Sequence, residues 1–434
     1  MRVPYSILLY LLMPLVLLHL FWRGFRQHGY WRRVHERFGL VRRRPNGIAV
    51  WVHAVSVGES LAALPLVRRL LERYPPGSVL VTTTTPSGSE RVQAAFGDRV
   101  VHAYAPYDLP GAVNRFLRRM QPRRVIVMET ELWPNLFHAL ARRRVPIVIA
   151  NARLSPRSMG RYRRIRALTA ETLSHCTAVA AQSPADAERF RSLGADPARV
   201  HVLGNLKFDL EMPEDMVAAG RTLRARWGEA RPVWIAASTH EGEEDAALRA
   251  HRILLARFRQ AVLILVPRHP QRFDAVARLA ADSGLRTVRR SAITVAAAAD
   301  SHPAPAPEEA QALEQAQVLV GDSMGELPMY FGASDIAFVG GSLVEVGGHN
   351  VLEPAALGLP VLFGPYMFNF EQARALLLEH QAARQIDGLL QLEPVLSRLF
   401  QDPQQRAAMG KAGREVLQAN RGALQRLMNL IENS

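Results

Sequence analysis

The stretch VLVGDSMGELPMYFGASDIAFVGGSLVEVGGHNVLEPAALGLPVLFGP, from Val318 to Pro365, decides the fold. In it, apolar runs of strand length alternate with glycine-rich turns, and each turn is followed by a segment with helical character. Glycines let the backbone approach a ligand closely, and helix N-termini offer free N–H groups to phosphate. Glu326 and Glu353 stand in the first turns of two such helices, where carboxylates suit ribose hydroxyls. The stretch therefore predicts one wall of a nucleotide site.

The same alternation continues on the N-terminal side of this stretch. Strand-like runs recur with helical segments between them, at IAVWVHAV, VLVTTTT, VVHAYAP, RVIVMET, VPIVIANARL, TAVAAQS and VHVLGNL. The series pauses at the polar run KFDLEMPEDM (207–216) and restarts with VWIAASTH and AVLILVPRHP. Strands that alternate with helices predict parallel, doubly wound sheets. A chain of 434 residues is long enough for two such α/β domains.

These patterns divide the chain into five expected segments. They are an anchor at 1–22, a basic juxtamembrane segment at 23–46, α/β domains at 47–212 and 213–401, and C-terminal helices at 402–434. Within the second domain, the alanine- and proline-rich run at 293–309 predicts a flexible surface excursion. Ligands of open α/β sheets bind beyond the carboxyl ends of the strands, so two such domains facing each other are expected to form a cleft.

The N-terminus reads as a membrane anchor. Val3 to Trp22 has twenty residues without a charge, enough for a helix of ~30 Å that spans one hydrocarbon core. Eight arginines and one acid follow between Arg23 and Arg44, where a signal peptide would need a small-residue cleavage site. The positive-inside rule then predicts a single-pass anchor with the body in the cytoplasm and the arginines on anionic lipid. A monotopic helix and a cleaved signal remain as alternatives.

The net charge of +15 indicates an acidic partner: nucleic acid, an anionic membrane surface or a phosphorylated substrate. A nucleic-acid binder should carry a stripe of arginines interleaved with aromatic residues on one face. Here the arginines concentrate in the juxtamembrane segment and are otherwise scattered, so no nucleic-acid partner is expected. The single cysteine, Cys176, is expected in a core and fits a reducing compartment.

Candidate catalytic residues in the first domain follow its predicted strands. Glu59, in HAVSVGES, lies in the first turn of a helix, where it can act as a general base or as a capping carboxylate. Glu129 and Glu131 end the fourth strand and are expected on one face, as catalytic groups or as partners of arginines. Lys207, one of two lysines, places a compact ammonium against a developing anion or lies on the surface.

Candidate ligand contacts in the second domain also follow predicted strands. Arg268 suits a phosphate, and the pair Arg268 and His269 suits a base edge. Ser238 and Thr239 are expected to cap the next helix. The remaining nucleotide contacts are Gly325, Glu326, Asn350, Val351, Leu352 and Glu353. His349 and Glu353 could share a metal, but no third ligand is visible in the sequence and none is expected.

An ordered set of motifs resembles one known family. HAVSVGES, TTTTPSG, ETELWPN, NARLS, GNLKFD, AASTHEGEE, LVPRHPQRF, GDSMGEL and GGSLVEVGGHNVLEPAALGLPVLFGP are similar to motifs of the 3-deoxy-D-manno-octulosonic acid (Kdo) transferases of Gram-negative bacteria. These enzymes act in the pathway to the lipopolysaccharide inner core. The resemblance runs from the N-terminal anchor to about residue 380.

The resemblance implies a GT-B fold and an inverting, metal-independent and cofactor-free transfer of Kdo from CMP-Kdo to lipid IVA, on the cytoplasmic side of the inner membrane. It implies that Glu59 is the base and that Glu129 and Lys207 assist the transition state. It places CMP against Arg268-His269, 324–326 and 350–353. A membrane-associated GT-B glycosyltransferase with a UDP-sugar donor is the nearest alternative. A GT-B-like epimerase is a more distant one, because it gives the anchor no role.

Overall fold

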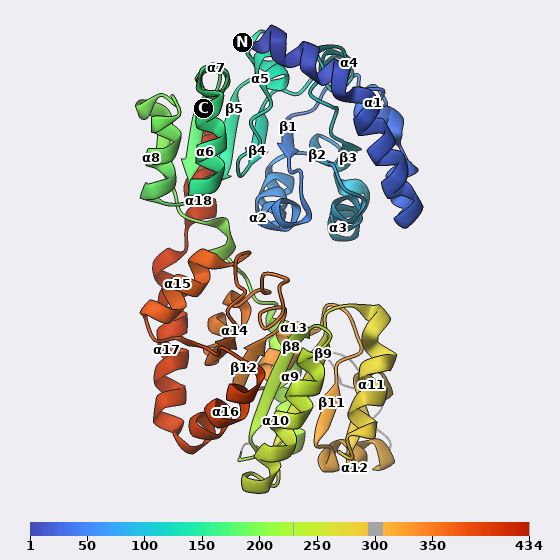
Figure 1. The fold of residues 1–434 in the computed structure, drawn as a ribbon, viewed down its shortest axis with the longest axis vertical. Helices are drawn as coiled ribbons and strands as arrows, with labels where there is room; N and C mark the ends of the chain where they lie inside the picture. Colours follow the sequence, from blue (N-terminus) through green and yellow to red (C-terminus); the bar gives the residue numbers. More distant parts are fainter. Residues whose placement is uncertain (229, 294–306, 434) are drawn as a thin grey trace. The chain divides into compact units, whose positions relative to one another are not determined.

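The computed structural model describes residues 1–228, 230–293 and 307–433, which form two compact α/β units (Figure 1). The first unit consists of Met1–Asp209 and Asn420–Ser434, and the second of Leu210–Ala419. The expected boundary after residue 212 lies close to this division. The C-terminal segment 402–434, expected as one piece, is instead divided between the two units, because its last helix packs against the first sheet.

The first unit is built on a parallel sheet of seven strands in the order β3-β2-β1-β4-β5-β6-β7. Its inner strands are buried on both faces, which explains why their sequences are continuous apolar runs without polar alternation. The strands are β1 (Val50–His53), β2 (Val79–Thr83), β3 (Val101–Tyr104), β4 (Val125–Met128), β5 (Ile147–Ala152), β6 (Ala178–Ala181) and β7 (Val200–Val202).

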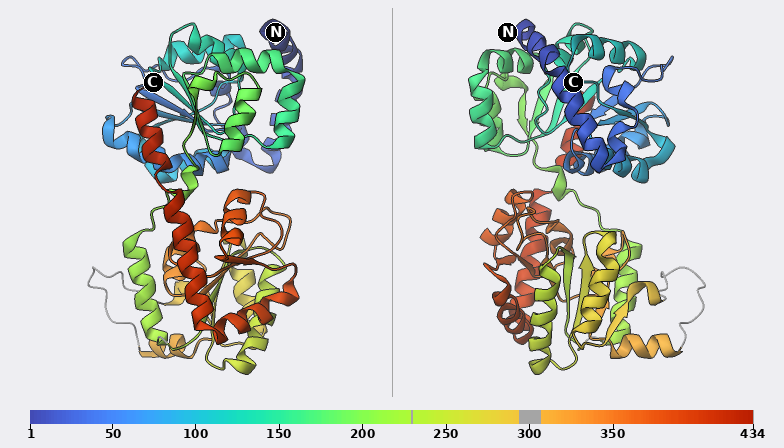
Figure 2. Two further views of the ribbon diagram at one scale, coloured as in Figure 1. Left: turned by 90° about the vertical axis from the view of Figure 1, so that its left-hand side faces the viewer. Right: turned by 45° about the vertical axis from the view of Figure 1, so that its right-hand side comes forward.

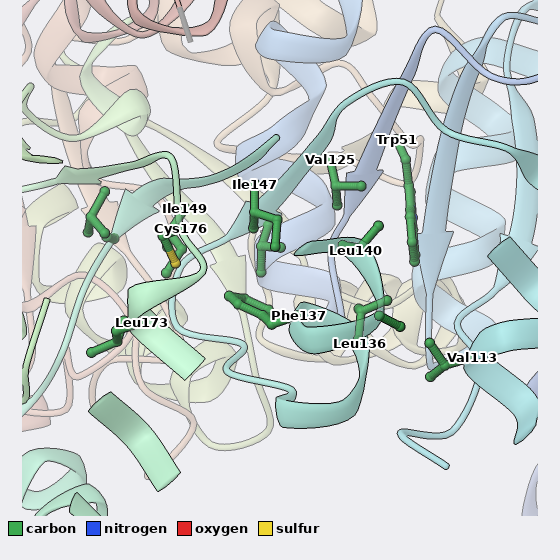
Figure 3. Close-up of a cluster of buried hydrophobic side chains, with 14 of the residues drawn as sticks. Trp51, Val113, Val125, Leu136, Phe137, Leu140, Ile147, Ile149, Leu173 and Cys176 are labelled. Atoms are coloured by element: carbon green, nitrogen blue, oxygen red, sulfur yellow. The ribbon is translucent and has the colours of Figure 1, made fainter. Parts of the chain in front are cut away.

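Helices cover both faces of the first sheet. Side chains of α4, α5, α7 and α8 form one core with it, and side chains of α2, α3 and the C-terminal α18 form the other. Figure 3 shows part of the first core, where Phe137 and Leu140 of α5 lie near Ile147 and Trp51 of the sheet. The helices are α2 (Val57–Arg73), α3 (Pro86–Phe96), α4 (Pro110–Met120), α5 (Pro134–Ala141), α6 (Pro156–Arg164), α7 (Arg166–Ser174), α8 (Pro184–Ser192) and α18 (Ala423–Glu432). Cys176 is buried in the same core, as predicted.

The second unit has a parallel sheet of seven strands in the order β10-β11-β9-β8-β12-β13-β14. The strands are β8 (Val233–Thr239), β9 (Val262–Pro267), β10 (Thr287–Arg289), β11 (Val318–Val320), β12 (Ile336–Val339), β13 (Val361–Phe363) and β14 (Ala383–Gln385). The two edge strands, β10 and β14, were not predicted. Each is three residues long and mostly half-exposed, so neither presents an apolar run.

Helices again lie on both faces of the second sheet. Side chains of α10, α11 and α16 share one core, and those of α9, α12 and α13 share the other. The helices are α9 (Glu214–Trp227), α10 (Glu243–Arg257), α11 (Phe273–Asp282), α12 (Pro307–Gln315), α13 (Leu327–Gly332), α14 (Leu352–Ala356), α15 (Glu371–Glu379), α16 (Leu392–Gln401) and α17 (Pro403–Asn420). Of the predicted surface excursion at 293–309, residues 294–306 are not among the described residues.

The N-terminal segment forms a single helix, α1 (Arg2–Arg26), which is long and apolar enough to cross a membrane. The basic segment after it folds into two short helices, η1 (His28–Trp31) and η2 (Val34–Phe38). Arg37 is only 4% exposed, and its guanidinium donates to the backbone oxygen of Thr84 at 2.8 Å. The whole basic segment was expected to lie on lipid. Arg37 instead has a structural role inside the first unit.

Each sheet has one point where the strand order reverses. In the first unit the chain moves outward from β1 to β2 and β3, then returns to place β4 on the other side of β1. In the second unit the reversal lies between β8 and β12. The carboxyl ends of the strands at such a switch point diverge and leave a crevice where ligands of open α/β sheets bind. A ligand site is therefore expected at the switch point of each sheet.

Candidate active site

Glu59 lies beside the switch point of the first unit. It is in the first turn of α2, directly after β1, and its side chain is 7% exposed. Its carboxylate accepts the N–H groups of Val55 at 2.8 Å and Ser56 at 3.3 Å, while the Ser56 hydroxyl accepts the Glu59 N–H at 3.2 Å. This reciprocal arrangement is a capping box. The capping interpretation of Glu59 is thus confirmed, and it leaves a catalytic role open.

The pKa of Glu59 is raised above its ordinary value. Burial is the main cause, and the negative charge of Glu129 adds to it, while the hydrogen bonds from Val55 and Ser56 act in the opposite direction. A carboxylate with a raised pKa is a stronger base than a solvated one, and a base near neutrality transfers protons most effectively.

Glu129 and Glu131 follow the neighbouring strand, β4, on the other side of the switch point. The expectation that strand alternation turns them to one face is wrong, because β4 ends at Met128 and Glu129 takes a left-handed conformation at φ +54°. Both nevertheless join the electrostatic cluster of Glu59. Burial first, and then the charge of Glu59, raises the pKa of Glu131 to about 7. Its carboxylate accepts the indole N–H of Trp133 at 2.8 Å.

Lys207 comes from the far side of the sheet, in η5 (Leu206–Phe208) after β7. Asn151 holds η5 in place, because its side-chain oxygen accepts the N–H of Leu206 at 3.0 Å. Asn151 is 2% exposed, and its backbone has a left-handed conformation at φ +54°. Residues other than glycine adopt this conformation at a cost in free energy. Burial lowers the pKa of Lys207, and the charge of Glu129 partly restores it. The first unit therefore brings Glu59, Glu129 and Lys207 into one cluster, together with Glu131.

In the second unit, histidines gather around Arg268 at the switch point. His240 follows β8, and its Nε2 lies 2.9 Å from Nε2 of His349, with the two rings stacked. The ring of His269 meets His240 edge-on, with centroids 5.3 Å apart. Burial, followed by the charge of Arg268, lowers the pKa of His349 to about 3. Neutral imidazoles beside one guanidinium can donate and accept hydrogen bonds while Arg268 supplies the positive charge.

Glu243 organises the glycine-rich turn after β12. This side chain, 1% exposed, accepts the N–H groups of Gly341 at 2.7 Å, Ser342 at 3.2 Å and Leu343 at 3.0 Å. It also accepts the N–H of His240 at 2.9 Å. The free N–H groups that the sequence offered to phosphate in this turn are therefore already occupied by a carboxylate. Glu243 was not among the residues selected from the sequence, where its only signal is an acid at the start of a predicted helix.

The predicted cap of α10 is wrong. Ser238 and Thr239 belong to β8, and the N-cap residue of α10 is Gly242, at φ +90°. A bulge in the pairing with β9 between Ala237 and Thr239 puts Ser238 at φ +55°. The extra loop residues carry His240 to the end of the sheet, which sequence periodicity could not show.

Met324, Gly325 and Glu326 form the turn after β11, next to β9 in the sheet. Met324 is 51% exposed, and Gly325 has φ +86° with open space around it. Glu326 occupies the N-cap position of α13, and its carboxylate accepts from Arg290 at 2.8 Å. Arg290 was missed in the sequence, because it lies just before the alanine- and proline-rich run and follows no predicted strand.

Asn350 and Glu353 interact directly at the start of α14. The side-chain amide of Asn350 donates to Glu353 at 2.9 Å, and its oxygen accepts the N–H of Leu352 at 3.1 Å. Burial raises the pKa of Glu353. The side chains of Val351 and Leu352 are fully buried, so these two predicted contacts can offer a ligand only backbone groups. Within the described ranges, no three His, Cys, Asp or Glu residues are grouped to hold a metal ion.

Strands β11, β9, β8 and β12 are neighbours in the sheet, so the predicted contacts of the second unit lie in a row at the carboxyl ends of these strands. In the order of these strands, the row consists of 324–326, Arg268-His269, His240 and 349–353. Two Rossmann-like units, each with polar side chains at its switch point, are typical of proteins with the GT-B fold.

Comparison with known proteins names the family within this class. The chain is 43% identical to 3-deoxy-D-manno-octulosonic acid transferase of Haemophilus influenzae over 434 residues, which covers 99% of this chain and 98% of the relative. It is 38% identical to the Bordetella pertussis protein of the same name, over 100% of this chain and 99% of that protein. Residues 32–210 also match the family described as 3-Deoxy-D-manno-octulosonic-acid transferase (kdotransferase). The chain belongs to the Kdo transferase family and is a glycosyltransferase.

A solved structure supports the fold at low sequence identity. The UDP-GlcNAc 2-epimerase of Neisseria meningitidis, bound to UDP-GlcNAc, aligns with a TM-score of 0.56 and 13% identity over 89% of this chain and 100% of that one. At this identity the likeness concerns the fold alone. It confirms the predicted pair of Rossmann-like domains.

Proposed function

We propose that this protein transfers Kdo from CMP-Kdo to lipid IVA with inversion at the anomeric carbon and without a metal ion. Membership of the Kdo transferase family supports the transferred sugar. The observation that carries the mechanism is the cluster of Glu59, Glu129 and Lys207 at the switch point of the first unit. Burial raises the pKa of Glu59 and lowers that of Lys207, and groups with such shifts are suited to proton transfer and charge stabilisation.

Glu59 is proposed as the general base. Its raised pKa suits removal of a proton from a sugar hydroxyl of the acceptor as that oxygen attacks the anomeric carbon. The bonds from Val55 and Ser56 fix the carboxylate and leave lone pairs on both oxygens for the hydroxyl. Glu129 and Lys207 are proposed to balance charge around the transition state, since the charge of Glu129 raises the pKa of Glu59 and also acts on Lys207, where it opposes the effect of burial.

The second unit is proposed to bind the CMP moiety. Arg268 supplies a cation for the phosphate, and the neutral rings of His269, His240 and His349 supply hydrogen bonds around it. Gly325 and Glu326 are proposed to contact the nucleotide from the turn after β11, and Asn350 and Glu353 from the start of α14. Cationic side chains on the departing phosphate give a physical reason to expect activity without a metal.

The attachment of the protein to the inner membrane through α1, with both units in the cytoplasm, is part of the same proposal. Its support is the length and hydropathy of α1, together with a lipid acceptor and the arginines around the helix.

A single reaction tests the proposed function. Purified protein is incubated with CMP-Kdo and lipid IVA, and the lipid is analysed by mass spectrometry. We expect a lipid heavier by one or more Kdo units, with the same yield in the presence of EDTA. The absence of a Kdo adduct, or transfer from UDP-sugars instead, would overturn the proposed donor, and loss of activity in EDTA would overturn metal independence.

A further inference from the structure

The start of helix α1 is tied to the body of the first unit by polar side chains. The Tyr5 hydroxyl donates to Oδ2 of Asp108 at 3.0 Å, and the Ser6 hydroxyl donates to Oδ1 of Asn135 at 2.9 Å. Arg2 donates to the same Asn135 oxygen at 3.3 Å. Ser6 is only 9% exposed, so this face of the helix is covered by protein.

The partners of this contact belong to the folded core. The Asp108 carboxylate also accepts the N–H groups of Asn135 at 3.0 Å and Leu136 at 2.7 Å, at the start of α5. Leu136 lies in the core that α5 shares with the sheet. The first turns of α1 are therefore attached to a rigid part of the domain.

The end of α1 packs on the short helix η1, which belongs to the same unit. The indole N–H of Trp31, in η1, donates to the backbone oxygen of Phe21 at 3.1 Å, and the two rings stack with centroids 5.8 Å apart. Gly24 faces this ring so closely that a Cβ atom would lie 1.8 Å from Nε1 of Trp31. The glycine thus allows the last turns of α1 to pack on η1.

These two attachments restrict where the helix can lie. With 25 residues, α1 is ~37 Å long, slightly more than the thickness of a hydrocarbon core. A crossing helix would carry Arg2, Tyr5 and Ser6 to the far side of the bilayer, about 30 Å from Asp108 and Asn135. A helix whose two ends both contact one cytoplasmic domain cannot have its ends on opposite sides of a membrane.

The free face of α1 is apolar along its whole length. Its most exposed residues recur every three or four positions and form one stripe, while Leu12, Val16 and Leu17 outside the stripe are less exposed, at 37 to 40%. The stripe consists of Val3 (63% exposed), Ile7 (57%), Leu11 (71%), Leu15 (62%), Leu18 (58%), Trp22 (67%) and Phe25 (61%). Figures 1 and 2 show α1, in dark blue, running along the outside of the first unit.

Positive charge lies at both ends of this stripe. At the start, Arg2, Arg142 and Arg143 line a cavity of about 400 Å³ with His138 and Asn135, and no carboxylate lines it. At the other end, Arg23 and Arg32 are exposed. An apolar stripe between two groups of arginines is complementary to the acyl chains and phosphates of an anionic lipid leaflet.

We propose that α1 lies in the plane of the cytoplasmic leaflet, with its apolar stripe in the acyl chains and its other face on the first unit, and does not cross the membrane. The inference rests on the proposed membrane attachment and replaces the single-pass placement expected from the sequence. The first unit is then held against the lipid surface along the full length of the helix.

Cysteine labelling distinguishes the two placements. The natural cysteine, Cys176, is 1% exposed, so an introduced cysteine is labelled selectively. One reporter is a cysteine in a short hydrophilic extension ahead of Met1, and the matched reporter is Leu390→Cys, at a position 93% exposed in the second unit. A membrane-impermeant maleimide is applied to spheroplasts and to inverted inner-membrane vesicles.

We expect both reporters to react only in inverted vesicles. Reaction of the N-terminal reporter in spheroplasts, with Leu390→Cys reactive only in inverted vesicles, would establish a crossing helix and overturn the inference. Recovery of the intact protein in the soluble fraction would contradict the proposed membrane attachment, on which the inference rests, without bearing on Kdo transfer.

A cross-linking pair tests the docked face directly. Ser6→Cys with Asn135→Cys should be joined by a short cross-linker in native membranes. The matched pair Ile7→Cys with Asn135→Cys should not, because Ile7 is on the free stripe. If the first pair fails to cross-link in a variant that retains transferase activity, α1 leaves the domain in the membrane and the inference is wrong.

Discussion

Glu59 combines a structural role with the proposed catalytic one, and a substitution can separate them. Glutamine also suits the third helical position of a capping box, so Glu59→Gln should keep the start of α2 intact. Glutamine cannot accept a proton near neutral pH. We therefore expect kcat to fall by about 10²- to 10⁴-fold, while the free energy of unfolding falls by only about 1 to 2 kcal/mol, because glutamine can accept only one of the N–H groups of Val55 and Ser56. Steady-state kinetics and chemical denaturation measure the two quantities.

Glu72→Gln is the matched control for this substitution. Glu72 is in the same helix, with a side chain 59% exposed and paired to Arg69 at 3.0 Å. Exposed pairs of this kind contribute little, so both activity and stability should remain at the wild-type level. Undiminished transfer by Glu59→Gln would remove the base assignment while leaving the donor and acceptor as proposed.

Glu131 should make the stability of the first unit depend on pH. Its pKa is about 7 in the folded protein and 4.5 ordinarily, so between these values the folded state binds more protons than the unfolded state. The contribution of Glu131 to stability is therefore greatest below pH 4.5 and declines as the pH rises from 4.5 to about 7. Glu131→Gln cannot ionise, but it can still accept from Trp133.

As the pH rises from 5 to 8, we expect the free energy of unfolding of Glu131→Gln to increase relative to that of wild type by about 1 to 2 kcal/mol. This value is smaller than the full pKa shift of Glu131 would give, because solvent screens a partly exposed carboxylate. Denaturant unfolding of both proteins at the two pH values measures this gain. A difference between variant and wild type that stays constant with pH would mean that the pKa of Glu131 is not raised.

The candidate site was predictable where polar residues directly follow apolar runs. Glu129 and Arg268 directly follow strands, and Glu59 is in the first turn of the helix after one, which is why sequence alone could select them. Their partners could not be selected in this way. Glu243 and Arg290 act through contacts with residues 98 and 36 positions away, Gly341 and Glu326 respectively. Such contacts depend on the order of strands in the sheet, and local periodicity carries no information about that order.

At the scale of elements, the turn after β12 depends on a glycine that nothing larger can replace. Gly341 is at φ +64°, and a Cβ atom would lie 2.9 Å from the His349 ring. We expect Gly341→Ala to destabilise the second unit by about 1 to 3 kcal/mol and to weaken CMP binding, because His349 must move. Calorimetric unfolding and a binding titration with CMP measure these effects.

Gly388→Ala is the control for the turn. Its backbone is extended, at φ −174°, and no atom lies within 4 Å of the added methyl group. We expect no loss of CMP affinity and a small change in stability. If Gly341→Ala and Gly388→Ala had the same stability and the same CMP affinity, the turn would tolerate a side chain, which would contradict the role assigned to Gly341.

The strands were predictable to different extents. Central parallel strands are buried on both faces, so they appear in sequence as continuous apolar runs, and β8 and β9 were found for this reason. The edge strands β10 and β14 contain arginines and are half-exposed, so they give no such signal. The bulge at Ser238 and the left-handed Glu129 were also missed, because tertiary contacts, not residue type, set their backbone.

At the scale of the whole molecule, the first unit is discontinuous in sequence. Residues 1–209 form most of it, but α18 adds Ala423, Leu427, Met428 and Ile431 to its core, each 1 or 2% exposed. Figure 2 shows α18, in red, against the first sheet. Asp209 accepts the N–H groups of Gly422 and Leu424, which fixes the start of α18 beside the end of the first segment.

This connectivity predicts that a change near the C-terminus unfolds the N-terminal unit. Leu427→Asp places a charge in a buried position and removes apolar contact, and such substitutions cost about 3 to 5 kcal/mol. That loss is a large part of the stability of an ordinary domain. In calorimetry the transition of the first unit should shift to lower temperature while that of the second unit, which ends at Ala419, stays in place. Gln425→Asp, exposed on the same helix, should shift neither. A shift confined to the second unit would show that α18 does not complete the first core in solution.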